Sequence, residues 1–182
     1  MRKTCDTCPA NYTSFEIGNV VKCLKYGQQG LLSSAVQTCK IDGAKPPLPK
    51  TAEENKDLLS FFNSKRHVQQ NNFALDLSYN KWEGEFVTST GEKVKFTNWF
   101  KGEPNDKNSA QAHVVMWDEG SWFDFNGTHD TAVTICELPC PTGLENSSLS
   151  TSNSTSVSTT TDDTTLTFTT TVYTTTPVIQ GK

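Results

Sequence analysis

The spacing of apolar residues changes along the chain, from a helical period before residue 70 to strand-like alternation after it. Between residues 31 and 39 apolar side chains recur every three or four positions, which places them on one face of a helix. A second helix is predicted to begin at Thr51, because Thr51 and Glu54 have the spacing of a capping box, in which each side chain can bond to the backbone amide of the other residue. Three prolines separate the two helices, and none of them can continue a helix: Pro46, Pro47 and Pro49.

Short strands separated by turns are predicted from Phe73 onward. Residues 73–77 are apolar and alternating, and residues 114–117 and 132–136 have the composition of buried strands. The stretch 95–130 is rich in glycine, asparagine and aspartate, so it is expected to be mostly loop. Because helices come first and strands follow, the pattern indicates an α+β fold.

The composition changes abruptly after Cys140. Serine and threonine make up about half of residues 141–182, which contain few large apolar side chains. Such a segment has too little apolar surface to offset the entropy lost on ordering, so we expect a disordered, mucin-like tail. The chain thus divides into an N-terminal segment at 1–7, a domain at 8–140 and the tail at 141–182.

The cysteines and the net charge restrict the compartment and the partners. Six cysteines, all within the first 140 residues, indicate three disulfides formed in an oxidising compartment. No apolar segment follows the first three residues, so no signal peptide is visible, and no long apolar run predicts a transmembrane segment. The net charge of −4 and the lack of a basic patch argue against a nucleic-acid partner. Four N-glycosylation sequons agree with a secreted, extracellular glycoprotein; they begin at Asn11, Asn126, Asn146 and Asn153.

The domain also carries a series of short motifs that resembles the C-type lectin-like domain family. The segment from Cys8 to Phe15 is similar to the opening motif of that family, and residues 35–39 resemble the end of its first helix. The other motifs follow in the family's order: Glu83-Gly84-Glu85-Phe86, Asn98-Trp99, Gly102-Glu103-Pro104-Asn105, Val114-Val115-Met116, Trp122 and Ile135-Cys136-Glu137. The resemblance covers residues 8–140 and implies two helices, small antiparallel sheets and a long loop that carries the ligand site.

The resemblance also implies how the cysteines pair. A bridge from Cys39 to Cys136 would close a loop of nearly a hundred residues and contribute about 4–5 kcal/mol in the chain-entropy model. The full set of implied pairs is Cys39–Cys136, Cys8–Cys23 and Cys5–Cys140. A rival interpretation, in which Cys5 and Cys8 form a redox or zinc motif, lacks a second ligand pair at a suitable spacing.

One bridge that the family normally has in its long-loop region is missing here at both ends. His113 stands at one of its positions, and no cysteine follows Trp122 until Cys136. We therefore expect the long loop to be less constrained than in typical members, and His113 to be a partly buried core residue. The four tryptophans are expected in the core or beside it: Trp82, Trp99, Trp117 and Trp122.

The long loop contains Glu103-Pro104-Asn105, which resembles the calcium and sugar motif of members that bind mannose, fucose or GlcNAc. In such members carboxylate and amide oxygens hold Ca²⁺, and sugar hydroxyls complete its coordination. The resemblance implies a cis Glu103–Pro104 bond and assigns the ion and sugar contacts to Glu103, Asn105, Gln111 and Asp124. At two positions the sequence departs from the family, because Gln111 replaces a glutamate and Phe123 replaces an asparagine. The lower charge is expected to weaken the ion's binding.

Two functions stay open on this evidence. The intact motif favours calcium-dependent binding of mannose-type glycans, such as those on cell-surface glycoproteins. The replaced ligands favour a calcium-independent module that binds a protein, a glycan or another surface ligand. The chain has no serine-hydrolase order or zinc-protease motif, so it is predicted to be a binding module and not an enzyme.

Overall fold

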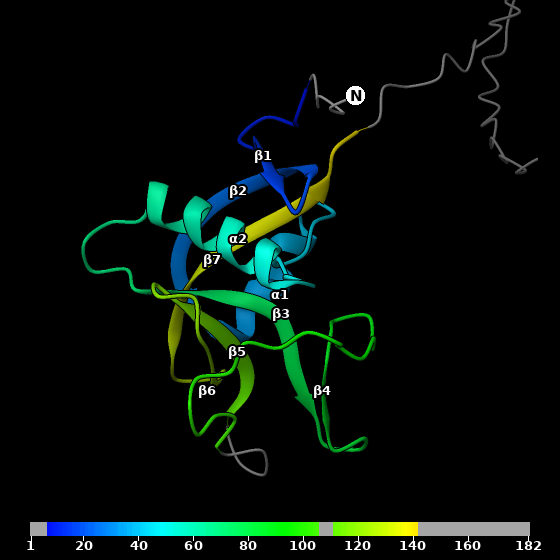
Figure 1. Ribbon diagram of the computed structural model, residues 1–182, viewed down its shortest axis with the longest axis vertical. Helices are drawn as coiled ribbons and strands as arrows, with labels where there is room; N and C mark the ends of the chain where they lie inside the picture. Colours follow the sequence, from blue (N-terminus) through cyan, green and yellow to red (C-terminus); the bar gives the residue numbers. More distant parts are fainter. Residues whose placement is uncertain (1–6, 106–110, 142–182) are drawn as a thin grey trace, which may run out of the picture. The chain divides into compact units, whose positions relative to one another are not determined.

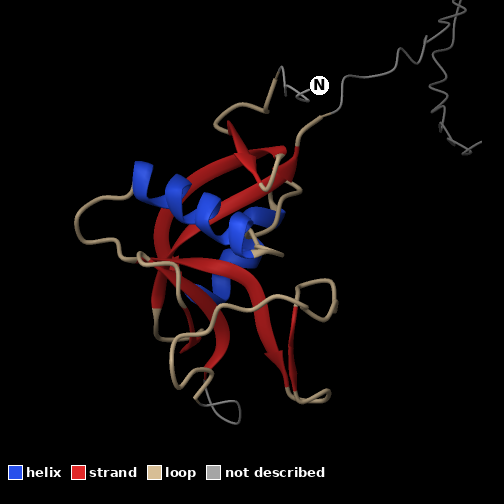
Figure 2. Ribbon diagram, in the orientation of Figure 1, coloured by secondary structure: helices blue, strands red, loops and turns tan. Residues whose placement is uncertain are grey.

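The computed structural model describes residues 7–105 and 111–141, and all the elements below lie within these ranges (Figure 1; Figure 2). The helices are η1 (Leu32–Ser34, a 3₁₀-helix), α1 (Ala35–Lys40) and α2 (Ala52–Lys65). The strands are β1 (Thr13–Ile17), β2 (Val20–Leu31), β3 (Asn72–Asn80), β4 (Glu85–Val87), β5 (Gln111–Trp117), β6 (Trp122–Asn126) and β7 (Thr131–Pro139).

The strands form two antiparallel ladders that meet at one short parallel contact. The first ladder contains β1, β2 and β7, and the second contains β4, β3, β5 and β6. They join where Phe73 of β3 pairs with Val133 of β7. In Figure 1 the first ladder lies above this junction and the second below it, with α2 passing in front of β2 and β7. The helices and the antiparallel ladders confirm the predicted α+β fold.

The start of α2 follows from its first residues. Thr51 is extended, and its hydroxyl accepts a hydrogen bond from the amide of Glu54 at 3.1 Å, as the capping box predicts. The Glu54 carboxylate does not return to the Thr51 amide; it accepts from the amide of Lys50 at 2.8 Å. Both bonds fix the angle at which the chain enters α2 from the proline-rich segment.

The main core lies between α2 and the sheet. Leu58, Phe61 and Phe62 of α2 are fully buried, and the Phe62 ring lies 4.9 Å from the ring of Phe73 on β3. Burying aromatic and aliphatic side chains of this size stabilises the fold by about 1.5–3 kcal/mol each. Their partners on the sheet include Leu24, Leu75, Val114, Met116, Trp122 and Ile135.

Two of the expected disulfides are present among the described residues. Cys8 is bonded to Cys23, and Cys39 is bonded to Cys136 across 97 residues of sequence. Both pairs confirm the pairing that the family resemblance implied. Cys140 is also disulfide-bonded, but Cys5, its expected partner, lies outside the described residues.

Three parts of the fold differ from the sequence-based expectation. A β1–β2 hairpin precedes the first helix, and its turn at Gly18 and Asn19 has positive φ angles at both residues. The stretch 95–130, expected to be mostly loop, contains β6 as well as β5. Trp82, expected in or beside the core, is 98% exposed at the tip between β3 and β4. The Gly18-Asn19 turn is a local hairpin signal that the apolar pattern does not reveal. For β6 and Trp82, long-range pairing and burial, which local composition does not encode, decided the outcome.

Candidate functional site

The site is built on the turn at residues 101–105, which is fastened to the edge of β6. The amide of Trp122 donates to the carbonyl of Asn98 at 2.8 Å, and the amide of Phe100 donates to the carbonyl of Trp122 at 3.0 Å. Gly102 has a φ of +98°, which a side chain would disfavour, and the Glu103–Pro104 bond is cis, as the resemblance implied. This backbone path brings Glu103 back to the strand that carries Asp124.

Three of the predicted site residues come together here. The amide of Asn105 donates to Asp124 Oδ1 at 3.1 Å, and Asn105 Nδ2 donates to Glu103 Oε1 at 2.8 Å. The second oxygens of both carboxylates, Glu103 Oε2 and Asp124 Oδ2, are buried and have no hydrogen-bond partner among the described residues. Asp124 itself is only 1% exposed. The turn therefore holds two carboxylates close together with one free acceptor atom on each.

The electrostatics of this pair are unfavourable without a cation. Burial, together with the neighbouring Asp124 carboxylate, raises the pKa of Glu103 from 4.5 to about 7. Two unpartnered, buried carboxylate oxygens are a costly arrangement that a divalent cation relieves by direct coordination. The residues present therefore fit a hard cation such as Ca²⁺, with Asn105 able to add an amide oxygen.

The remaining predicted ligand positions do not add charge to the site. Gln111 begins β5, but its side chain lies outside the described residues. Phe123 precedes Asp124 on β6, so its side chain points to the opposite face of the strand. The Phe123 ring stacks on the Phe100 ring, with 4.9 Å between the ring centres. Within the described residues no group of three or more His, Cys, Asp or Glu side chains is placed to hold a metal ion. The candidate site is therefore a pair of carboxylates with an amide, which is fewer ligands than the family motif supplies.

The fully buried Trp122 lies two residues before Asp124 on β6. Its Nε1 donates to Asn55 Oδ1 of α2 at 2.8 Å. The carbonyl of Gly120 accepts from both Asn55 Nδ2 at 3.0 Å and Asn98 Nδ2 at 2.8 Å. These bonds tie α2, the β5–β6 turn and the start of the long loop together. No sequence pattern marks Asn55 for this role, because its partners lie more than 60 residues away.

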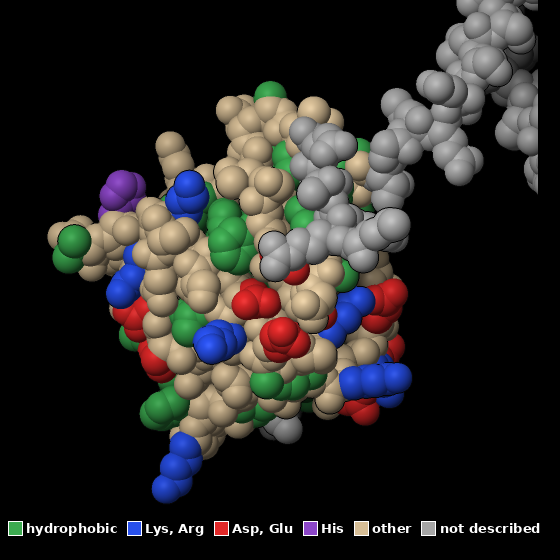
Figure 3. Space-filling view, turned by 45° about the horizontal axis from the view of Figure 1, so that its top comes forward, with side chains coloured by type: hydrophobic (Ala, Val, Ile, Leu, Met, Phe, Trp, Pro, Cys, Tyr) green, Lys and Arg blue, Asp and Glu red, His purple; other side chains and the backbone are tan. Residues whose placement is uncertain are grey.

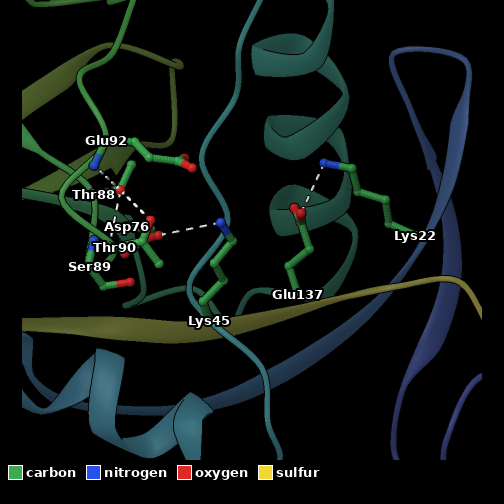
Figure 4. A network of polar contacts seen from close by, with 8 residues as sticks. All are labelled: Lys22, Lys45, Asp76, Thr88, Ser89, Thr90, Glu92 and Glu137. Carbon is green, nitrogen blue, oxygen red and sulfur yellow. Dashed lines mark hydrogen bonds and ion pairs between the residues drawn. The ribbon is translucent and has the colours of Figure 1, made fainter. Parts of the chain in front are cut away.

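A second polar network holds the turn that leads into the long loop (Figure 4). Asp76, buried in the middle of β3, accepts from the amide of Ser89 at 3.0 Å, and Lys45 Nζ lies 3.8 Å from its other oxygen. The hydroxyl of Thr88 accepts from the amide of Glu92 at 3.0 Å. These contacts fix residues 88–92 against the sheet and so set the direction in which the chain leaves toward Trp99.

His113 stands at one end of the disulfide bridge that the family normally has and this sequence lacks. His113 is half-buried, and its ring lies directly against Gly127, where a side chain would collide with it. Burial lowers the pKa of His113, which favours the neutral ring. The expectation of a partly buried core histidine is confirmed. The chain's two remaining histidines, His67 and His129, are exposed.

Two of the four sequons fall on described residues. Asn11 is exposed in the segment before β1, and Asn126 ends β6, where its Oδ1 accepts from the hydroxyl of Thr128 at 2.8 Å. Asn146 and Asn153 lie outside the described residues. On the face drawn in Figure 3, Lys and Arg side chains are interspersed with Asp and Glu, without a broad patch of one sign. None of the described helices is long and apolar enough to cross a membrane.

The fold and this turn define a class of small, disulfide-closed recognition domains with a ligand loop, and comparison with known proteins gives the family. The family model for the lectin C-type domain matches residues 29–138. The chain belongs to the C-type lectin domain family. Bovine pulmonary surfactant-associated protein D is 30% identical over 113 residues, which is 62% of this chain and 29% of that protein. The chain thus spans under a third of that relative's length.

Solved structures agree on the fold. The carbohydrate-recognition domain of cow CD23, determined in the presence of a GlcNAc2Man3 oligosaccharide, superposes with a TM-score of 0.60 at 22% identity, covering 73% of this chain and 96% of that one. A calcium-independent type II antifreeze protein superposes with a TM-score of 0.59 at 17% identity, covering 73% and 95%. Similarity at this level of identity establishes the shared fold, while the ligand depends on the site.

Proposed function

We propose that this domain binds carbohydrate in a calcium-dependent manner, with mannose-type glycans as ligands. The observation that carries the proposal is the pair of buried carboxylate oxygens without a hydrogen-bond partner, Glu103 Oε2 and Asp124 Oδ2, which lie beside Asn105. Glu103, Asn105 and Asp124 would hold the ion, and Gln111 is the fourth candidate. A bound calcium would supply open coordination positions for two adjacent sugar hydroxyls.

The residues around the ion would select the sugar through hydrogen bonds. A carboxylate oxygen of Glu103 accepts from a hydroxyl, while the Nδ2 group of Asn105 donates to one. Because the backbone N–H of Asn105 already donates to Asp124 Oδ1, the turn is fixed before the ligand arrives. A prearranged site of this kind loses less conformational entropy on binding, which supports recognition by few contacts.

Calorimetry with matched variants tests this proposal. We expect wild-type protein with intact disulfides to bind calcium, and to bind methyl α-mannoside only when calcium is present. Glu103→Gln and Asp124→Asn should each weaken calcium binding at least about tenfold, since each removes one of two negative charges from the site. Glu119→Gln is the matched control, because Glu119 is an exposed carboxylate in the β5–β6 turn. The same affinity in all four proteins would refute the assignment.

A second candidate function is recognition without calcium. Phe123 stands where the family has an oxygen ligand and stacks on Phe100, so the site has fewer ion ligands than the motif requires. A fold relative, the calcium-independent type II antifreeze protein, shows that this architecture exists without calcium dependence in that protein. Ligand binding that survives a chelator would favour this alternative over the calcium-dependent one.

We further propose that the protein acts outside the cell as a glycoprotein. The two described disulfides and the exposed sequon residue Asn11 support this. Expressed in a eukaryotic host with a secretion signal fused to its N-terminus, the protein should be exported to the medium with its cysteines oxidised. Treatment with an N-glycosidase should then lower its mass, and Asn11→Gln should remove part of that shift. Reduced, unglycosylated protein retained in the cytosol would contradict the proposal.

A further inference from the structure

An open cavity of about 540 Å³ borders the turn that carries the candidate ion site. Pro104, between the two site residues Glu103 and Asn105, forms part of its wall. The cavity and the ion site therefore share one short stretch of backbone. Its main lining residues are Glu85, Phe86, Lys93, Val94, Trp99 and Pro104.

Part of the cavity wall is apolar, and the rings that form it are held in place by neighbouring aromatic side chains. The Phe86 ring packs 5.1 Å from that of Trp99 and 5.3 Å from that of Tyr79. The Trp99 ring in turn lies 5.9 Å from the ring of the buried Trp122. Half-buried rings fixed by several neighbours offer an apolar surface at low entropic cost. The C–H face of a saccharide ring is a suitable partner for such a surface.

Another part of the cavity wall offers charged hydrogen-bonding groups. Lys93 Nζ lies 2.9 Å from Glu85 Oε2, and the two side chains are 66% and 50% exposed. The ammonium group is a donor, the carboxylate is an acceptor, and both have hydrogen-bonding capacity left over after they pair. Thr97 adds a hydroxyl that can do either. A ligand with many hydroxyl groups matches this part, whereas a purely apolar group would leave it without partners.

We propose that this cavity is a second saccharide subsite, which takes the sugar unit linked to the one bound at Glu103 and Asn105. The inference rests on the proposed carbohydrate function and adds to it a preference for oligosaccharides over monosaccharides. Two features support a linked sugar as the occupant: the shared wall at Pro104, and the presence of both an apolar ring face and a donor–acceptor pair in one cavity. A net gain of one or two hydrogen bonds corresponds to about three- to tenfold in affinity.

The test compares methyl α-mannoside with a linear α-mannotriose by calorimetry, on the full chain in calcium. Wild type should bind the trisaccharide about three- to tenfold more tightly than the monosaccharide. Lys93→Ala, which removes a donor, and Val94→Tyr, which fills the cavity, should both reduce that preference and leave monosaccharide affinity unchanged. Lys95→Ala is the matched control, since Lys95 is an exposed lysine of the same segment outside the cavity. Unchanged unfolding midpoints would show that each variant is folded.

Each other outcome identifies which inference fails. If wild type binds the monosaccharide but shows no preference for the trisaccharide, or if the variants leave the preference intact, the subsite is refuted and the proposed function stands. If wild type binds neither sugar in calcium, both are refuted. If Val94→Tyr weakens the binding of a mannoside with an alkyl aglycone but not that of the trisaccharide, the cavity accepts an apolar group and the saccharide assignment is wrong.

Discussion

The buried hydrogen bonds of Asn55 give a prediction whose magnitude can be worked out from the structure. Asn55 on α2 is 6% exposed, accepts from Trp122 Nε1 at 2.8 Å and donates to the carbonyl of Gly120 at 3.0 Å. Asn55→Ala would leave the indole N–H buried without a partner, which costs about 1–3 kcal/mol. The lost bond to Gly120 adds about 0.5–1.5 kcal/mol, even though Asn98 still donates to that carbonyl. The higher helix propensity of alanine offsets about 0.6 kcal/mol of these losses, so we expect the free energy of unfolding to fall by about 1–4 kcal/mol.

Asn63 on the same helix is the matched control. It is exposed, and its Nδ2 donates weakly to the carbonyl of Asp118 at 3.4 Å. Asn63→Ala gains the same helix propensity, about 0.6 kcal/mol, but loses no buried bond, so its stability should stay within about 0.5 kcal/mol of wild type or rise slightly. The difference between the two variants thus isolates the buried bonds.

Equilibrium urea unfolding with intact disulfides, followed by tryptophan fluorescence, measures both variants. The midpoint of Asn55→Ala should shift while the slope stays constant. Adding Trp122→Phe removes the partnerless donor, so a double-mutant cycle should show a coupling of at least about 1 kcal/mol. Equal losses from Asn55→Ala and Asn63→Ala, or additive effects in the cycle, would show that the Asn55–Trp122 bond does not stabilise the fold.

Three further predictions concern the charges and the cross-links. In the presence of a chelator, raising the pH from about 4.5 to about 7 should lower the midpoint temperature of thermal unfolding. Because the pKa of Glu103 is raised, the folded state binds this proton more tightly than the unfolded chain, and the stability that the proton contributes is lost as it leaves. Asp124→Asn should flatten the dependence of the midpoint on pH. Replacing Cys39 and Cys136 by alanine should cost about 4–5 kcal/mol in urea unfolding, since the bridge spans 97 residues; a loss under about 1 kcal/mol would contradict the loop-entropy argument. Asp76→Ala should cost about 1–3 kcal/mol in the same assay by leaving the amide that it binds without a partner, and an unchanged midpoint would be evidence against that network.

Part of this protein could be predicted from local sequence alone. The capping residues Thr51 and Glu54 located the start of α2, and the alternation after Phe73 located the strands at 73–77, 114–117 and 132–136. These signals are short-range, because helix caps and strand periodicity depend on residues only a few positions apart. The cysteine pairing and the cis proline came from the ordered motifs of the family resemblance, which carry long-range information that periodicity lacks.

Other features were decided only by tertiary structure. Nothing in the local sequence distinguishes exposed Trp82 from buried Trp122. The closeness of Glu103 and Asp124 depends on the loop folding back along β6, and the cavity behind Pro104 requires three separate segments to meet. A sequence fixes which groups are available, but the register and packing of distant segments decide which of them face one another.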